Sequence, residues 1–244
     1  MIKNKLIYHF SKIAPYGKQL TIKLNNGIKC NIRSKTMDKA VLKEVWITNL
    51  YGKHSFDIKE KDVVVDIGAH IGMFAIYAAH KAKNGKVISF EPFIKNYELL
   101  ESNAKINNLK NLKTQNVAVG KKNGQQRLYL SPDNNTGGHS LYLKTENNDS
   151  FVDIPTISYN SMIENYKLDK IDYLKLDCEG AEYDILFNAS KQAISKIEKI
   201  VMECHPHKDN TKEKMIEFLK DSGFELIIDN SAQTTELMIY AKRI

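Results

Sequence analysis

From residue 61 onward the sequence repeats one order of segments: a short apolar run, a turn, and a longer amphipathic stretch. Residues 63–67 read VVVDI and lead through a glycine turn into an apolar stretch closed by Asn84-Gly85, which predicts a strand followed by a helix. The same order returns at residues 86–107, 171–190 and 197–222. Strands that alternate with helices predict an α/β fold, in which helices cover both faces of a mostly parallel sheet.

The two ends of the chain depart from this order. Residues 19–33 alternate apolar and polar side chains around Asn26-Gly27, which predicts a β-hairpin, and residues 38–49 have the pattern of a short helix. Residues 224–229 and 235–242 are expected to form a final antiparallel pair of strands. We therefore predict an N-terminal extension of hairpin and helix at residues 1–58 and one α/β domain at residues 59–244.

Composition narrows the classes of function. The sequence has no run of about 18 apolar residues, and its first residues lack the apolar core of a signal peptide, so we expect no membrane span and no leader. Its three cysteines lie far apart without metal-ligand spacing, which indicates reduced thiols and a cytoplasmic location. The net charge is +7, but lysines occur along the whole chain, so solvation explains them better than nucleic-acid binding.

The turn after the first strand of this repeat, DIGAHIG at residues 66–72, is the most informative motif. Ligands of open α/β sheets bind at the carboxyl ends of the strands. The dinucleotide fingerprint GxGxxG needs glycines where this chain has His70 and Met73, which argues against a nicotinamide cofactor. An acid followed by two glycines four residues apart is instead the pattern of an S-adenosylmethionine turn. Glu91 ends the next strand, 19 residues after Gly72, where a carboxylate can accept hydrogen bonds from a ribose diol.

Four segments together resemble the FkbM-type S-adenosylmethionine-dependent methyltransferases: VVVDIGAHIGMFAIYA, VISFEPF, NVAVG and LKLDCEGAEYDIL. The resemblance covers about residues 40–206. It implies a class I methyltransferase fold, Rossmann-like, with a seven-stranded sheet whose last strand is antiparallel. It also implies methyl transfer, usually to a hydroxyl oxygen of a small molecule or glycan.

The resemblance also implies which residues contact the cofactor. Position 70 is His in this chain, where the family more often has Asn, and both side chains can donate a hydrogen bond. The contacts that it implies are Asp66, Gly68, Ala69, His70, Gly72, Glu91, Asn116 and Val117. Asp177 is added from its place at the end of a later strand, as a contact to the methionyl end of the cofactor or to the acceptor.

The acceptor side of the reaction is expected at the ends of the two strands that close the repeat. An alcohol needs its proton removed during methyl transfer, and the expected catalytic residues are Asp177, Glu179 and His205. Which of these residues is the general base stays open. Glu182 is equally well explained as an acid in the first turn of a helix, and His207 is expected to be exposed.

Several questions remain open at the level of sequence. Glu203, together with the predicted catalytic residues, has donor types that could hold a metal, but the spacing does not require one, and we predict no metal. The polar loop at residues 131–140, which contains Ser140, is either a cover for the acceptor pocket or a plain surface turn. The alternatives to an O-methyltransferase are an RNA methyltransferase and a non-catalytic scaffold. The acceptor is open, as is the oligomeric state, with a homodimer among the options.

Overall fold

A computed structural model describes residues 1–132, 134–142, 150–205, 210–229 and 237–244. Its centre is a seven-stranded sheet in which the last strand of the chain runs in the opposite direction to the other six. The expected class I methyltransferase fold with an antiparallel final strand is therefore confirmed. The spatial order is β11 (Phe224–Asp229), β12 (Leu237–Arg243), β10 (Lys199–Cys204), β9 (Tyr173–Leu176), β3 (Val63–Ile67), β4 (Lys86–Phe90) and β5 (Leu112–Gln115).

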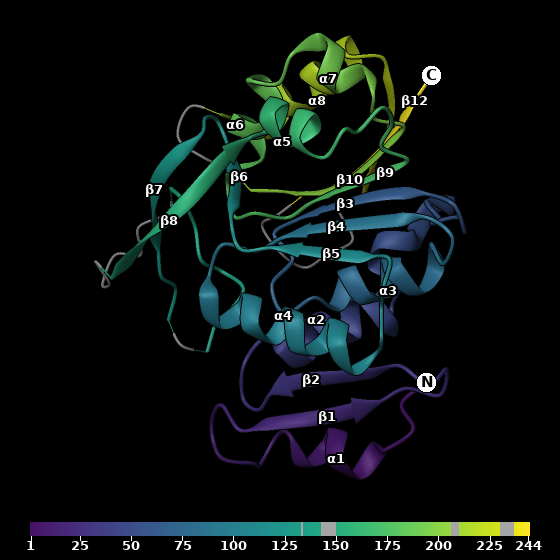
Figure 1. Cartoon of the computed structure of the whole chain (residues 1–244), viewed down its shortest axis with the longest axis vertical. Coiled ribbons are helices and arrows are strands. Elements are labelled where there is room, and N and C mark those ends of the chain that lie inside the picture. The colour runs from purple at the N-terminus through teal and green to yellow at the C-terminus, as the bar shows by residue number, and fades with distance from the viewer. Residues whose placement is uncertain (133, 143–149, 206–209, 230–236) are drawn as a thin grey trace.

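Helices cover both faces of this sheet, as Figure 1 shows. Alternate residues of each strand point to opposite faces, so Val65 belongs to one hydrophobic cluster and Val64 to the other. One layer contains α2 (Asp38–Trp46), α3 (Met73–Lys81) and α4 (Ile94–Ile106). The other contains α5 (Tyr159–Asn165), α6 (Glu182–Phe187), α7 (Lys191–Ser195) and α8 (Lys212–Asp221).

The N-terminal extension contributes α2 to the α2–α4 layer and packs residues 1–33 on the outside of that layer. It consists of α1 (Lys5–Phe10), the expected hairpin of β1 (Gln19–Lys23) and β2 (Lys29–Arg33), α2, and the 3₁₀ segment η1 (Leu50–Ser55). The hairpin is tied to α4 because the Asn103 amide accepts from the backbone N–H of Asn31 at 2.6 Å and donates to its carbonyl at 3.1 Å. Hairpin residues share a hydrophobic cluster with the central sheet, and the domain boundary at residue 58 stays a prediction.

One expected strand is divided in two. The pattern LKTQNVAV at residues 112–119 predicts a single strand. In the structure β5 ends at Gln115, and β6 (Ala118–Gly120) joins a second sheet with β8 (Phe151–Ser158) and β7 (Gly124–Tyr129). The side-chain amide of Asn116 donates to the carbonyls of Glu91 and Pro92, both at 2.9 Å. These bonds hold the chain across the end of β4, so that it leaves the central sheet there.

No helix within the described ranges is both long and apolar enough to cross a membrane.

Candidate active site

A cavity of about 380 Å³ opens at the carboxyl ends of β3, β4, β9 and β10. Its volume lies within the range of small-molecule sites in proteins. Most of the residues expected at the site line it, namely Gly68, Ala69, His70, Glu91, Asp177, Glu179, Glu203 and His205.

The glycines of the turn after β3 are required by close packing. Gly68 has a φ of +81°, and a Cβ atom there would lie 1.8 Å from the carbonyl oxygen of Asp177. Gly72 has a φ of +84° and precedes α3, where a Cβ would lie 2.3 Å from Cδ1 of Leu100. Any larger residue at position 68 would push the turn away from the end of β9.

Glu91 ties the end of β4 to this turn. Its carboxylate accepts from the backbone N–H of His70 at 2.8 Å and from that of Phe93 at 2.9 Å. Burial raises the pKa of Glu91 to about 7, although both of these hydrogen bonds favour the charged form. Each carboxylate oxygen keeps capacity for a further donor.

Lys175 was not among the residues expected at the site, yet it lies at the centre of the charge arrangement. Its buried ammonium group donates to the carbonyl of Gly68 at 2.6 Å and lies 3.4 Å from Asp66 and 3.3 Å from Asp177. Burial lowers the pKa of Lys175, but the two acids outweigh burial and raise it overall. A lysine inside the apolar run YLKL is the sequence signal that could have revealed it.

Asp177 receives a second contact from the N-terminal extension. The hydroxyl of Tyr51, in η1, donates to Asp177 at 3.2 Å, and the Tyr51 ring is buried against the cavity. Burial raises the pKa of Asp177, but the charges of Lys175 and His205 outweigh this effect and lower it overall. Asp177 therefore presents a negative charge to the cavity at neutral pH.

A histidine between carboxylates forms the opposite wall. His205 Nδ1 lies 3.0 Å from Oε1 of buried Glu182, and His205 Nε2 lies 3.7 Å from Oε2 of Glu179. Glu182 also accepts from the backbone N–H groups of Cys178 and Gly180, both at 2.9 Å. Glu182 is thus more than a first-turn acid, because it orients His205 and fixes the turn after β9.

The charges around His205 change its acid–base behaviour. Burial lowers the pKa of His205, but the hydrogen bond and charge of Glu182, followed by the charges of Glu179 and Asp177, raise it to about 10. His205 is therefore an imidazolium at neutral pH and not a ready proton acceptor. By ordinary pKa a histidine is a better proton acceptor than a carboxylate at neutral pH, but this ordering does not hold for His205 in this environment.

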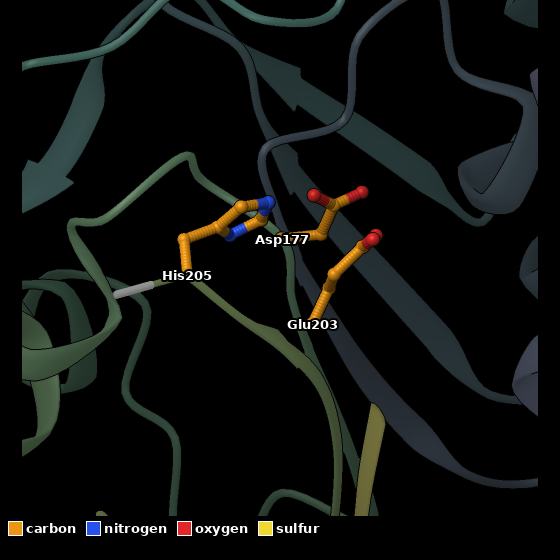
Figure 2. Close-up of side chains that lie close together, drawn as sticks. All are labelled: Asp177, Glu203 and His205. Atoms are coloured by element: carbon orange, nitrogen blue, oxygen red, sulfur yellow. The ribbon is translucent and has the colours of Figure 1, made fainter. Parts of the chain in front are cut away.

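Figure 2 shows Asp177, Glu203 and His205 facing one another at the strand ends. One ligand atom from each lies within 4.8 Å of the others, which is compatible with a hard metal ion. The ammonium of Lys175, 3.3 Å from Asp177, already places a cation beside this group. Independence from metal stays a prediction.

Four expected cofactor contacts do not line the cavity. Asp66 is fully buried and faces Lys175 and Ser89, while Gly72 is covered by Leu100. The side-chain amide of Asn116 donates to carbonyl groups at the end of β4, and Val117 packs against a hydrophobic cluster. The wall in that region is made by the next residues, Ala118 and Val119. His207 lies outside the described residues.

A polar network joins the turn to the N-terminal extension and to the loop after β7. Asp38, at the start of α2, accepts from Arg33 Nη2 at 2.8 Å and from the Thr136 hydroxyl at 3.0 Å. His70 Nε2 lies 3.1 Å from the same hydroxyl. Asn96 of α4 donates to the Thr136 carbonyl at 2.9 Å. The loop is thereby fixed over the cavity, which its residues Asn135, Gly137 and His139 help to line.

Ser140 anchors the other end of this loop. Its buried hydroxyl donates to the carbonyl of Glu179 at 2.5 Å, and Glu179 has a φ of +54°. Of the two sequence interpretations of residues 131–140, the described part of the loop therefore supports a cover over the pocket.

Thr136→Val is expected to lower the free energy of unfolding by about 2 kcal/mol, because valine keeps the shape but removes a buried hydrogen bond to a charged partner. Urea denaturation would measure this change. The matched control is Thr48→Val, whose hydroxyl bonds the Glu44 carbonyl at the surface and should cost little. Equal losses in both variants would show that the network does not hold the loop.

Comparison with known proteins places this geometry in a family. Residues 66–226 match the model of the methyltransferase FkbM domain. AMB antimetabolite synthetase AmbE of Pseudomonas aeruginosa is 26% identical over 231 residues, covering 79% of this chain but 11% of that protein. The 31-O-demethyl-FK506 methyltransferase FkbM of Streptomyces tacrolimicus is 21% identical over 236 residues, covering 86% of this chain and 90% of that protein.

A solved structure agrees at the level of the fold. The methyltransferase FkbM from Methylobacillus flagellatus superimposes with a TM-score of 0.57 at 14% identity, covering 82% of this chain and 47% of that chain. The matched family model begins at Asp66, so it includes the glycine turn, Glu91 and the carboxylates after β9. The protein belongs to the FkbM methyltransferase family.

Proposed function

We propose that the protein is an S-adenosylmethionine-dependent O-methyltransferase whose acceptor is a hydroxyl group of a small molecule or glycan. The observation that carries this proposal is the group of carboxylates beside the glycine turn, in which Glu179 and Asp177 face the same cavity as Gly68. Such a cavity offers negative charge to a sulfonium cofactor and a proton acceptor to a hydroxyl group.

The residues of the turn fit this cofactor. His70 Nδ1 is buried without a hydrogen-bond partner among the described residues, although His70 lines the cavity, so a polar ligand group would satisfy it. Glu91 would accept from the ribose hydroxyls, and Gly68 permits close approach of the backbone. Ala118 and Val119 would supply an apolar wall for the adenine ring.

When bound, the cofactor supplies an electrophilic methyl group. The chain's own task is then to position the acceptor and remove its proton. We assign proton removal to Glu179, because its carboxylate lines the cavity and its backbone is fixed by Ser140. His205, held as an imidazolium by Glu182, orients the Glu179 carboxylate at 3.7 Å rather than acting as the base.

Transfer to oxygen is supported by the chemistry of the site and by one relative. The turn after β9 reads DCEG and offers carboxylates, whereas methylation of base amines commonly uses an NPPY or DPP turn that holds a planar amine. The relative from Streptomyces tacrolimicus is named for a 31-O-demethyl acceptor. A hydroxylated small molecule or glycan is therefore favoured over RNA.

The test is calorimetric titration with S-adenosylmethionine, S-adenosylhomocysteine and NAD, followed by acceptor screening with hydroxylated glycans and natural products. Binding of the first two and transfer of a labelled methyl group to a hydroxyl are expected. Binding of NAD alone would refute the cofactor assignment, and methylation of RNA but of no hydroxylated small molecule or glycan would refute the acceptor assignment.

The pKa of Glu91 predicts how the affinity for the cofactor depends on pH. Its pKa of about 7 in the free protein means that the carboxyl group gains a proton as pH falls below 7, and a protonated group loses acceptor capacity for the ribose diol. The dissociation constant for S-adenosylmethionine should rise below pH 7, by at most about tenfold per pH unit. Glu91→Gln should bind more weakly at pH 8 and show a flatter profile. An unchanged slope in that variant would assign the pH dependence to another group.

A further inference from the structure

The positive charge of the protein is concentrated at its N-terminus. Residues 1–37 contain eight Lys or Arg and no Asp or Glu. The remaining residues contain 28 Lys or Arg against 29 Asp or Glu, so they are close to neutral. The net charge of +7 thus comes from residues 1–37. A uniform distribution of solvated lysines along the chain does not account for it.

The same segment exposes large apolar side chains. Leu6 is 87% exposed, Ile13 is 74% exposed and Phe10 is 41% exposed. Along a helix the positions of Leu6 and Phe10 fall on one face, and the helical turn continues because the N–H groups of Ile13 and Ala14 bond the carbonyl of Phe10. Single exposed apolar residues are ordinary, but a contiguous group of them indicates a surface for binding.

The opposite face of this segment fixes it to the protein. Ser11 and Ala14 are each 1% exposed, and no residue of α1 itself is buried. The Ser11 hydroxyl donates to the Tyr8 carbonyl at 2.7 Å, and Lys39 of α2 donates to the same carbonyl at 2.8 Å. In Figure 1, α1 forms the outermost layer at the N-terminal end, beyond the β1–β2 hairpin. The apolar face therefore points toward solvent, while the buried face of the same segment is held against the protein.

Exposed lysines flank this apolar segment in the sequence, and the ammonium of Lys18 lies 5.8 Å from the centre of the Phe10 ring. Burial lowers the pKa of Lys39, and the nearby charge of Lys12 lowers it further, as expected where cations gather without acids. We name as the basic apolar patch the side chains of Leu6, Ile7, Phe10 and Ile13 together with Lys3, Lys5, Lys12 and Lys18.

We propose that the basic apolar patch docks the protein onto an anionic lipid surface. Aliphatic side chains enter the boundary between headgroups and acyl chains, while surrounding lysines bind anionic headgroups. Each lysine near such a surface contributes about a fivefold gain in affinity, and the patch presents four. Docking at this end leaves the cavity, which opens at the strand ends, free to receive an acceptor.

Other occupants fit the patch less well. A two-fold contact with a second copy would place the same lysines against one another, at a segment that has no acid to pair with them. Nucleic acid would satisfy the lysines but would leave Leu6 and Ile13 without an apolar partner. Of these three occupants, only a lipid surface provides both negative charge and an apolar layer.

The experiment is co-sedimentation of the full chain with vesicles of phosphatidylcholine alone and of phosphatidylcholine with phosphatidylglycerol. We expect binding to the anionic vesicles only, weakened by high ionic strength. Lys5→Glu/Lys12→Glu should reduce binding more than about tenfold, and Leu6→Ser/Ile13→Ser by about tenfold. The matched control, Lys220→Glu/Ile227→Ser, changes an exposed lysine of α8 and an isoleucine of β11 that is 41% exposed, and should bind like the unaltered protein.

All of the substituted side chains are exposed, so circular dichroism should show unchanged folding in each variant. Equal binding to neutral and anionic vesicles, or an equal loss in the control, would overturn the proposal. The absence of vesicle binding would also overturn the proposal. If the chain instead formed a dimer that Leu6→Ser/Ile13→Ser dissociates, the patch would be an interface between two copies. None of these readouts uses methyl transfer, so the outcome is independent of the proposed reaction.

Discussion

Lys175→Met is expected to lower the free energy of unfolding at pH 7 by roughly 3–5 kcal/mol, because it removes one partner from a buried charge group. Asp66 is fully buried and, within the part of the chain that the structure describes, would keep only its contact with Ser89, at 3.4 Å. Asp177 would keep the hydroxyl of Tyr51 and the charge of His205. The uncompensated charge of Asp66 therefore accounts for most of the expected loss.

Two further measurements distinguish this cause from lost packing. Burial already raises the pKa of Asp66, and removal of Lys175 should raise it further. A carboxyl whose pKa is raised by folding contributes stability at low pH and loses it as pH rises, so the deficit of Lys175→Met should shrink between pH 7 and pH 5. Asp66→Asn combined with Lys175→Met should recover part of the stability. A deficit that is independent of pH and additive with Asp66→Asn would contradict the charge explanation.

Glu179→Gln is expected to lower kcat by about 10²–10⁴-fold while leaving the affinity for S-adenosylmethionine within about twofold. Glutamine keeps the size of the side chain but cannot take a proton from the acceptor. The matched variant is Glu203→Gln, which removes a second carboxylate from the same cavity. Loss of turnover in Glu203→Gln, together with normal turnover in Glu179→Gln, would identify Glu203 of β10 as the general base.

The pH profile of kcat separates Glu179 from His205. The pKa of His205 is about 10, so a reaction that used neutral His205 as its base would rise steeply with pH up to that value. With Glu179 as the base, kcat at saturating cofactor should be nearly constant between pH 6 and pH 9. A continuous tenfold rise per pH unit across this range would identify His205 as the base.

Local sequence patterns predicted the strands, helices and turns, because the interactions that form these elements act between residues close together in sequence. The apolar run of β3 and the turn that follows it indicated a buried strand, and Gly68 and Gly72 are required by their positive φ angles and close contacts. Glu91 lies beside the cavity because the carboxyl ends of parallel strands meet at one edge of the sheet. The hydrogen bonds of Asn116 to the end of β4 could not be predicted in this way, because they join positions 24 and 25 residues apart.

The sequence by itself determined the fold class, the glycine turn and the set of acids at the strand ends, since periodicity and backbone conformation are local properties. Only the tertiary structure showed that the ammonium of Lys175 lies between the carboxylates of Asp66 and Asp177, and that Glu182 makes His205 an imidazolium. It also showed that Tyr51, from the N-terminal extension, reaches Asp177 across 126 positions of sequence. Charge state and pocket shape depend on distances between distant segments, and those distances are set only when the layers pack.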